Sequence, residues 1–236
     1  MSFLRQLINR LLYPHTYCND AFVKYLRRKG AVIGEKTRFI SPKNCLVDEA
    51  RCDYIKIGKN CCLSFASLIA HDYSWYVLKD AYNDILPDSG DDIIIGDNCF
   101  IGYRATILKG TTIGDNCIIG GGAIVKGNIP SNTVWAGVPA RQICTLNEFY
   151  QKRKKNALKD AVVRRDHYQK RWGRFPTIQE MGFFAYLFLE RTEENYDKYF
   201  RNLEFNGIIN NPVIRDFFFS STPKFISFED FLAYKE

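Results

Sequence analysis

The sequence predicts a mainly β protein, built around a parallel β-helix and flanked by helical segments. One observation is a motif, IGDNCFIG at residues 95–102, that returns eighteen residues later as IGDNCIIG at residues 113–120. A second is an aliphatic residue at every sixth position: Ile95, Ile101, Ile107, Ile113, Ile119 and Val125. A six-residue period fits neither the helical period of 3.6 nor simple strand alternation, so it indicates a coil of short strands and turns.

The composition is that of an ordinary globular protein with a mild positive charge. The 236 residues can form one large domain or a large and a small one. The net charge of +7 fits a partner that carries phosphate or an acidic glycan. No basic patch with interleaved aromatics resembles a nucleic-acid module, so we expect no nucleic-acid partner. We see neither a long apolar run nor a secretory signal, and therefore expect a cytoplasmic location.

The eight cysteines are placed as core residues rather than as a disulfide framework. Cys61, Cys99 and Cys117 recur at the small inward position of the six-residue repeat. A thiol there acts as a compact apolar filler. Because no Cys-x-x-Cys pair has zinc spacing, we expect free thiols and no metal.

The N-terminal segment, residues 1–30, is predicted to be helical. Residues 3–13 place leucine and isoleucine on one helical face, opposite arginine, glutamine and asparagine. Docking on the same protein or on a neighbouring subunit is the favoured interpretation of this amphipathic helix. Peripheral membrane contact through residues 1–13 is the alternative.

The β-helix is predicted over residues 31–144, beginning at Ile33. Phe39 and Ile57 lie eighteen positions apart, which suggests that the irregular stretch between them keeps the phase, and Leu63 and Ile69 continue it. Ile57 and Ile95 are 38 positions apart, one coil plus about twenty extra residues. This extra material is assigned to a loop insertion at residues 72–92, which carries its own aromatic side chains. Long loops in compact domains are usually functional.

The last segment, residues 145–236, is predicted to form a helical lobe. Residues 147–172 form a charged helix, and aromatic residues are dense from 183 to 234. An aromatic core is the favoured interpretation, and a platform for stacking on sugar rings is the alternative.

Three features together resemble the hexapeptide-repeat acyltransferases, in particular the maltose, galactoside, serine and exopolysaccharide O-acetyltransferases. They are the repeats, the His71-Asp72-Tyr73 tripeptide where the phase breaks, and the closing WAGVPAR at residues 135–141. The resemblance covers about residues 30–144. It implies a left-handed β-helix of triangular section, a homotrimer, and acetyl-coenzyme A as acyl donor.

The resemblance also implies a histidine general base. Histidine suits the role because its ordinary pKa near 6.5 lets it take up and return a proton at neutral pH. Of the three histidines, only His71 lies where the insertion leaves the repeats. Asn44 is the candidate that orients the imidazole, with Asp72 and Asp53 as alternatives.

The remaining site residues follow from the family's pattern. Tyr103 and Gly121 match family positions that contact the pantetheine arm of the donor through their backbone, and Gly122 belongs to the glycine-rich turn that permits its close approach. Lys126 and Arg141 would bind its phosphates, although many relatives read Val-Thr-Lys-Asp where this chain has Val-Lys-Gly-Asn at residues 125–128. At the start of the insertion, Tyr73 and Trp75 would contact the acceptor.

The function expected from these features is acetyl-CoA-dependent O-acetylation of a sugar in a surface polysaccharide or lipopolysaccharide precursor, by direct transfer. One alternative is N-acetylation of an amino sugar on a nucleotide carrier. Another is a zinc enzyme resembling γ-type carbonic anhydrase, which would need about three converging histidines. The last alternative is a non-catalytic β-helix scaffold.

Overall fold

The computed structural model describes residues 11–200 and 212–235. The chain divides into two compact units, Met1–Tyr150 and Gln151–Glu236, and each is described here by itself. The division falls inside the helix that follows the repeats, a few residues after the boundary placed at 144/145 from the sequence.

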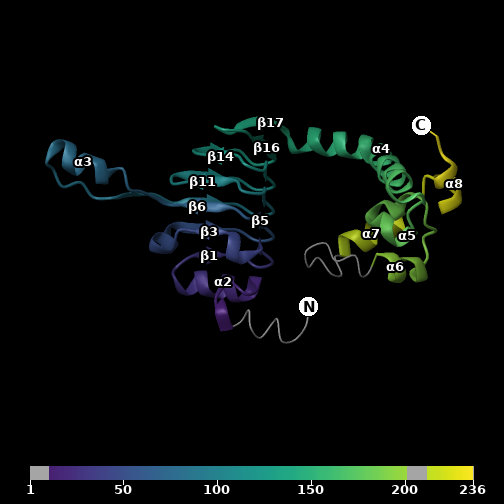
Figure 1. The fold of residues 1–236 in the computed structure, drawn as a ribbon, viewed down its shortest axis with the longest axis horizontal. Coiled ribbons are helices and arrows are strands. Elements are labelled where there is room, and N and C mark those ends of the chain that lie inside the picture. The colour runs from purple at the N-terminus through teal and green to yellow at the C-terminus, as the bar shows by residue number, and fades with distance from the viewer. Residues whose placement is uncertain (1–10, 201–211, 236) are drawn as a thin grey trace. The chain divides into compact units, whose positions relative to one another are not determined.

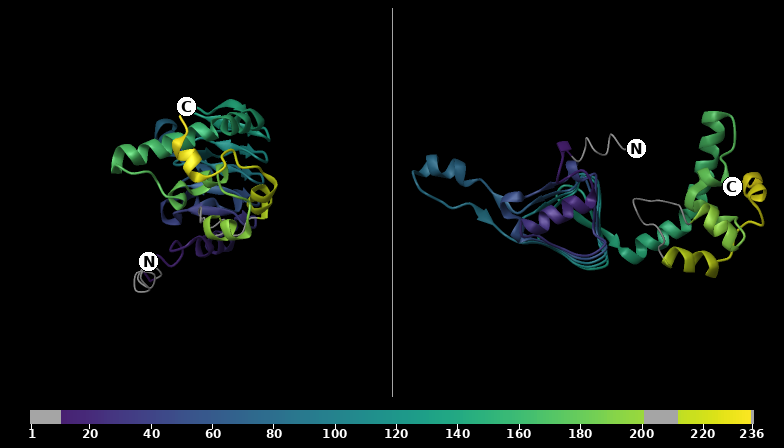
Figure 2. Two further views of the ribbon diagram at one scale, coloured as in Figure 1. Left: turned by 90° about the vertical axis from the view of Figure 1, so that its right-hand side faces the viewer. Right: turned by 90° about the horizontal axis from the view of Figure 1, so that it is seen from below.

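The first unit is a β-helix in which three parallel sheets enclose a triangular section (Figures 1 and 2). The first sheet contains β1 (Val32–Ile33), β4 (Ile55–Ile57), β9 (Ile93–Ile95), β12 (Thr111–Ile113) and β15 (Asn128–Ile129). The second contains β2 (Arg38–Ile40), β5 (Cys62–Ser64), β10 (Phe100–Ile101), β13 (Ile118–Ile119), β16 (Thr133–Ala136) and β17 (Arg141–Thr145). The third contains β3 (Leu46–Val47), β6 (Ser67–Ile69), β11 (Thr106–Leu108) and β14 (Ile124–Val125).

Successive coils stack in register, as the eighteen-residue repeat predicts. Ile95 pairs with Ile113 in the first sheet, and Ile101 pairs with Ile119 in the second. Their side chains are almost fully buried, because each coil covers the apolar side chains of the next. Within these three sheets, as the structure describes them, β17 is the one strand that runs antiparallel, against β16. The predicted fold, a left-handed parallel β-helix, is confirmed.

The repeat cysteines lie in this core as predicted. Cys61, Cys99 and Cys117 are buried, and each thiol contacts a backbone carbonyl of the following coil, for example Cys99 Sγ to Gly114 O at 3.1 Å. All eight cysteines are free thiols. Burial raises the pKa of the Cys52 thiol to about 11, which keeps it protonated and unreactive at neutral pH.

Two details of the phase inferred from the sequence were wrong. Phe39 stacks on Leu63 in the second sheet, whereas Ile57 stacks on Ile33 in the first, so the first coil is longer than eighteen residues. It contains the 3₁₀ helices η1 (Pro42–Asn44) and η2 (Glu49–Tyr54). The residue that faces the core in β6 is Leu68, which pairs with Ile107, and not Ile69. The corner before it is one residue shorter than in the later coils.

Helix α2 (Asn19–Arg28) closes the N-terminal end of the β-helix (Figure 1). Phe22, Val23 and Leu26 on one face join the main core. Asn19 just inside its start accepts a hydrogen bond from the backbone N–H of Phe39 at 2.8 Å. The amphipathic helix expected at residues 3–13 falls almost entirely on residues 1–10, which lie outside the described part of the chain.

The predicted insertion leaves the β-helix as an arm, while Ile57 and Ile95 on either side of it stack directly on each other (Figure 1). Its root is an antiparallel pair of strands, β7 (His71–Asp72) and β8 (Ser89–Gly90). Helix α3 (Trp75–Tyr82) follows β7 and buries none of its residues. Neither the strand pair nor the helix was predicted from the sequence.

The second unit is the predicted helical lobe. The charged helix expected at 147–172 is α4 (Leu146–Trp172), which begins in the first unit. After it come α5 (Ile178–Met181), η3 (Gly182–Leu187), α6 (Glu193–Tyr199), α7 (Pro212–Ser220) and α8 (Phe228–Ala233).

Many of the lobe's aromatic residues form its core, as the favoured interpretation requires. Phe188, Tyr196, Phe200, Phe218, Phe225 and Phe231 are buried together. Arg165, on the buried face of α4, donates from Nη1 to the backbone carbonyls of Phe231 and Tyr234. These bonds tie α4 to the end of α8.

Candidate active site

The candidate active site centres on His71, at the edge of the third sheet where the arm begins. The Nδ1 atom of His71 contacts Oδ2 of Asp48. His71 follows β6 and Asp48 follows β3, and these strands are parallel neighbours. Residues that leave parallel neighbouring strands meet at the same edge of the sheet, which explains how side chains 23 positions apart come together.

The Asp48 carboxylate is held in place by a second hydrogen bond. Its Oδ2 atom also accepts from the backbone N–H of Ala70 at 3.0 Å. The side chain of Asp48 is 3% exposed, whereas that of His71 is 16% exposed. The carboxylate therefore lies beneath the imidazole, on the core side of the site.

This contact sets the chemistry of the imidazole. When Nδ1–H donates to a carboxylate, a neutral imidazole carries its basic lone pair on Nε2. In that tautomer Nε2 is the atom that can accept a proton, which is the arrangement that general-base catalysis needs.

The orienting residue proposed from the sequence, Asn44, does not contact His71. Asn44 precedes β3 and therefore lies at the opposite edge of the third sheet, where its Nδ2 donates to Ser41 Oγ at 2.7 Å. Of the alternatives, Asp53 lies in η2, and Asp72 accepts from the backbone N–H of Ser74 at 2.8 Å. That bond, and then Lys109, hold the pKa of Asp72 below its ordinary value. Within the described residues, Asp48 is the acid that meets the imidazole.

The sequence contained a signal that could have identified Asp48. Ile33 and Ile57 stack although they are 24 positions apart, so the first coil has extra residues. With that length, Val47 pairs with Leu68. The next residue, Asp48, therefore lies beside the residues that follow β6. Asn44 was proposed from the resemblance to the family and not from the stacking of the coils.

The two acceptor residues expected on the arm differ in their relation to His71. The Tyr73 ring packs edge-on against the imidazole, with ring centroids 4.2 Å apart, and is 58% exposed. Trp75 starts α3 and contacts Tyr76, and its buried Nε1 has no hydrogen-bond partner among the described residues. Tyr73 is therefore at the candidate site, and no contact joins Trp75 to it.

The root of the arm is fixed by a lysine that the sequence reasoning missed. Lys109 follows β11 and donates to Ser89 Oγ at 2.6 Å and to Ser89 O at 3.1 Å. Its Nζ is also 3.3 Å from Oδ2 of Asp72. Lys109 thus holds both strands of the root, β7 and β8, next to His71.

Three of the residues expected to bind the donor lie together at the other edge of the third sheet. The backbone N–H of Gly122 donates to the carbonyl of Tyr103 at 2.8 Å. A Cβ atom at Gly121 would lie 3.1 Å from that carbonyl oxygen, so a side chain there would crowd the Tyr103 backbone. Tyr103 itself is 49% exposed, and its ring packs against Phe65. Gly121 and Gly122 are thus packed closely against the backbone of Tyr103.

The two expected phosphate ligands are exposed, and no contact joins them to Tyr103 or the glycines in the described chain. Lys126 follows β14, so it lies at the same edge as His71, two strands further along the sheet. At the usual strand spacing this is about 10 Å along the stack. Arg141 begins β17 and donates from Nη1 to the carbonyl of Ala140 at 2.9 Å.

In the described part of the chain, no group of three or more histidine, cysteine or acidic side chains is placed to bind a metal ion. None of the helices in residues 11–200 and 212–235 combines the length and apolar character that crossing a bilayer requires.

Comparison with known proteins identifies the repeat of this chain as a hexapeptide repeat. The family described as hexapeptide repeat of succinyl-transferase matches residues 92–126. The chain is 32% identical over 133 residues to protein CapG of Staphylococcus aureus. That match covers 56% of this chain and 76% of CapG.

Two further relatives carry descriptive names. The putative lipopolysaccharide biosynthesis O-acetyl transferase WbbJ of Escherichia coli K12 is 32% identical over 111 residues, covering 44% of this chain and 57% of that protein. Among solved structures, a maltose O-acetyltransferase from Clostridium difficile 630 is 28% identical, with a TM-score of 0.38. That match covers 53% of this chain and 75% of the other.

Proposed function

Because this chain belongs to the hexapeptide-repeat acyltransferases, we propose that it transfers an acetyl group from acetyl-CoA to a sugar hydroxyl, with His71 as the general base. The observation that carries the proposal is the contact between His71 and the buried carboxylate of Asp48 at the root of the arm.

In the proposed reaction, Nε2 of His71 takes the proton from the attacking hydroxyl. The hydroxyl oxygen forms a bond to the thioester carbonyl carbon, and the tetrahedral intermediate then breaks its carbon–sulfur bond. The proton on Nε2 passes to the departing thiolate, so the products are an O-acetyl ester and free coenzyme A. Asp48 acts as a positioning residue, because it holds Nδ1–H and stabilises the imidazolium while the proton is on the ring.

The donor would lie along the third sheet, between its two edges. Tyr103, Gly121 and Gly122 are exposed residues at one edge, and Lys126 lies at the other edge with His71. Lys126 and Arg141 are exposed cations that could meet phosphate groups, for which lysine acts as a point charge and arginine as a planar donor. Acetyl-CoA is present in the cytoplasm, where we place the reaction.

The acceptor would approach from the side of the arm. Tyr73 packs on His71 and exposes much of its ring, which offers an apolar face to a sugar next to the base. The relative WbbJ is described as a lipopolysaccharide biosynthesis O-acetyl transferase. We propose a sugar of a surface polysaccharide or lipopolysaccharide precursor as the acceptor class.

The test is acetyl transfer by the full-length protein with acetyl-CoA and sugar acceptors, measured as release of free thiol and by mass spectrometry of the product. We expect His71→Ala to lower kcat by about 100- to 10,000-fold, the range for removal of a general base. His15→Ala, which changes a histidine that stacks on Tyr25 of α2, is the matched control and should leave kcat unchanged.

Two results would overturn the proposal. Full transfer by the His71→Ala protein would exclude the base, and an acetyl product that resists mild alkali would indicate an amide instead of an ester.

A further inference from the structure

The C-terminal end of α4 carries aromatic side chains that the core of the lobe does not bury. Trp172 is 52% exposed, and its ring lies 4.5 Å from the ring of Tyr168 and 6.1 Å from that of His167. The guanidinium of Arg171 lies over Trp172, 5.3 Å from the ring centroid. We call His167, Tyr168, Arg171 and Trp172 the Trp172 patch. Its exposure distinguishes it from aromatic residues such as Phe218 and Phe231, which are buried.

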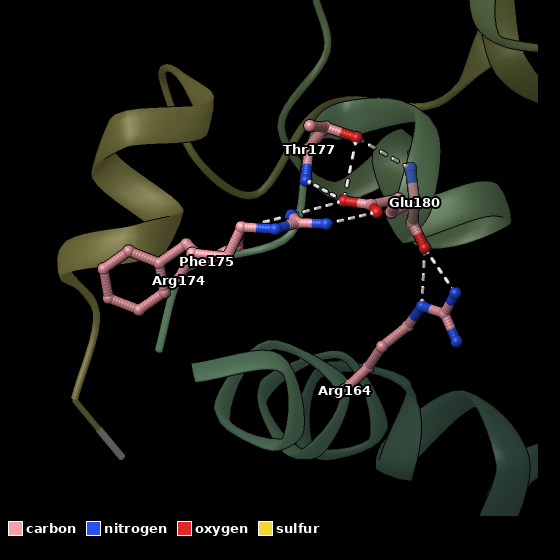
Figure 3. A network of polar contacts seen from close by, with 5 residues as sticks. All are labelled: Arg164, Arg174, Phe175, Thr177 and Glu180. Atoms are coloured by element: carbon pink, nitrogen blue, oxygen red, sulfur yellow. Dashed lines mark hydrogen bonds and ion pairs between the residues drawn. The ribbon is translucent and has the colours of Figure 1, made fainter. Parts of the chain in front are cut away.

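A network of polar contacts fixes the base of this patch (Figure 3). Arg174 donates to both carboxylate oxygens of Glu180, at 2.7 and 2.8 Å, and Arg164 Nε donates to the backbone carbonyl of Glu180 at 2.7 Å. Both guanidinium groups also lie against the Tyr168 ring, 5.6 Å from its centroid for Arg164 and 5.5 Å for Arg174. Tyr168 is thus held before any ligand arrives, which lowers the entropy lost on binding.

The turn after α4 is anchored by the same glutamate. Gly173 adopts a φ of +66°, and its N–H donates to the carbonyl of Gln169 at 3.0 Å, which ends the helix directly after Trp172. Glu180 also accepts hydrogen bonds from the backbone N–H and the hydroxyl of Thr177, at 2.8 and 3.1 Å. The end of α4 and the start of α5 therefore form one braced corner.

Positive charge is concentrated on the helix that ends at the patch. Of the residues in α4, nine are lysine or arginine and three are aspartate or glutamate, a net charge of +6 against +7 for the whole chain. Some of these cations are paired, such as Arg153 with Asp160 at 3.2 Å. Lys170 and Arg171 have no carboxylate partner among the described residues. They remain available to an anionic ligand beside the exposed rings.

We propose that the Trp172 patch binds a segment of an acidic polysaccharide. The apolar face of a sugar ring would pack on Trp172 and Tyr168, and a carboxylate or phosphate of the polymer would pair with Arg171 and Lys170. The inference rests on the proposed function, which supplies a saccharide acceptor, and it adds that this acceptor is polymeric and negatively charged.

The surroundings of the patch favour a glycan over a membrane. Insertion into a bilayer needs several neighbouring apolar side chains. The residues next to Trp172 on α4 are Gln169, Lys170 and Arg171, all of them exposed and polar. Single-stranded nucleic acid also carries both stacking rings and negative charge. The test must therefore distinguish its binding from that of an acidic polysaccharide.

The test measures binding by calorimetry with the full-length His71→Ala protein, which should bind an acceptor without turning it over. The probes are polysialic acid and polygalacturonate as acidic polymers, dextran as a neutral polymer, single-stranded DNA, and vesicles containing phosphatidylglycerol. We expect an acidic polymer to bind with an affinity that falls as salt is added, and dextran not to bind.

Matched variants separate the patch from the general charge of the helix. Trp172→Ala and Arg171→Gln should each weaken binding about tenfold, the effect of losing one stacked ring or one ion pair. Phe217→Ala removes another exposed ring of the lobe, and Lys159→Gln removes another exposed charge of α4. Both controls should bind as the parent does.

The inference is overturned if no acidic polymer binds, if DNA or vesicles bind in preference to them, or if the controls weaken binding as much as the patch variants do. Its failure is distinguishable from failure of the proposed function. Normal transfer by wild-type protein with unchanged binding by Trp172→Ala would exclude only the patch. Polymer binding that needs Trp172 in a protein without acetyl transfer would exclude only the reaction.

Discussion

The Asp48 carboxylate uses one oxygen, Oδ2, for both the backbone N–H of Ala70 and the imidazole of His71. The first bond fixes the carboxylate relative to the edge of β6, and the second transmits that position to the base. A buried carboxylate with two donors has little freedom to rotate, so the imidazole plane is set by the backbone of the β-helix. The imidazole of His71, the proposed base, is therefore supported by a rigid element rather than by the arm.

Replacing Asp48 with asparagine tests this positioning role. We expect Asp48→Asn to lower kcat by about 10- to 1,000-fold with little change in the KM for acetyl-CoA, because the amide can favour the wrong imidazole tautomer. The pH profile of kcat should change as well, which a purely structural role would not require.

The matched control is Asp72→Asn, which alters the neighbouring acid on the arm and should affect kcat much less. Unchanged kcat and pH dependence in a folded Asp48→Asn protein would contradict the assigned role.

At the scale of an element, the junction between α4 and α5 shows how one glutamate can brace a surface. Hydrogen bonds from Arg174, and then from Thr177, hold the pKa of Glu180 at about 2, well below its ordinary value of 4.5. The same side chain completes the capping box at the start of α5. Because the folded state favours the ionised form, this contribution to stability is present above pH 4.5 and is lost as the pH falls towards 2.

The pH dependence gives a direct check on this brace. At pH 7 we expect Glu180→Gln to unfold at a lower temperature than the wild type, and the difference should shrink as the pH is lowered from 4.5 to about 3. Circular dichroism at 222 nm measures the melting of the helices. Glu229→Gln, an exposed glutamate of α8, is the control and should melt as the wild type does. A difference that persists or grows at low pH would contradict the proposed ion pair.

At the scale of the whole molecule, the outer faces of the β-helix expose apolar side chains. Leu46 and Ile124 lie on strands of the third sheet and are 56% and 37% exposed, and Phe100 and Ile143 lie on strands of the second sheet and are 43% and 62% exposed. Apolar residues exposed along a sheet mark a surface that another chain can cover. They support the homotrimer that we propose for this protein.

Sedimentation tests the assembly. We expect full-length protein at micromolar concentration to sediment as three chains of 27.4 kDa each, because neighbouring copies would bury these faces. Ile124→Arg should shift the distribution towards monomer, whereas Lys59→Arg keeps the charge of an exposed residue at another corner and should not. A wild-type protein that stays monomeric would contradict the trimer.

His71 lies, as predicted, where the arm leaves the β-helix. Its position, the arm behind it and the stacked isoleucines followed from the repeat, because a period of six residues fixes which side chains enter the core of each coil. The count of residues failed in the first coil, which is longer than eighteen residues, and again at the short corner before β6, where Leu68 and not Ile69 enters the core. Asn44, which was proposed from the family's pattern, lies in the first coil and donates to Ser41.

The sequence by itself determined the β-helix, the free thiols of its core, the helical lobe and the histidine at the root of the arm. These are consequences of local periodicity and residue type, which need no knowledge of distant contacts. Only the tertiary structure decided that Asp48 holds His71, that Lys109 holds the arm, and that Trp172 stays exposed while aromatic residues such as Phe218 and Phe231 are buried. Each of these depends on which segments stack, and the irregular lengths of the first coil and of the turn after α4 hide that information from the sequence.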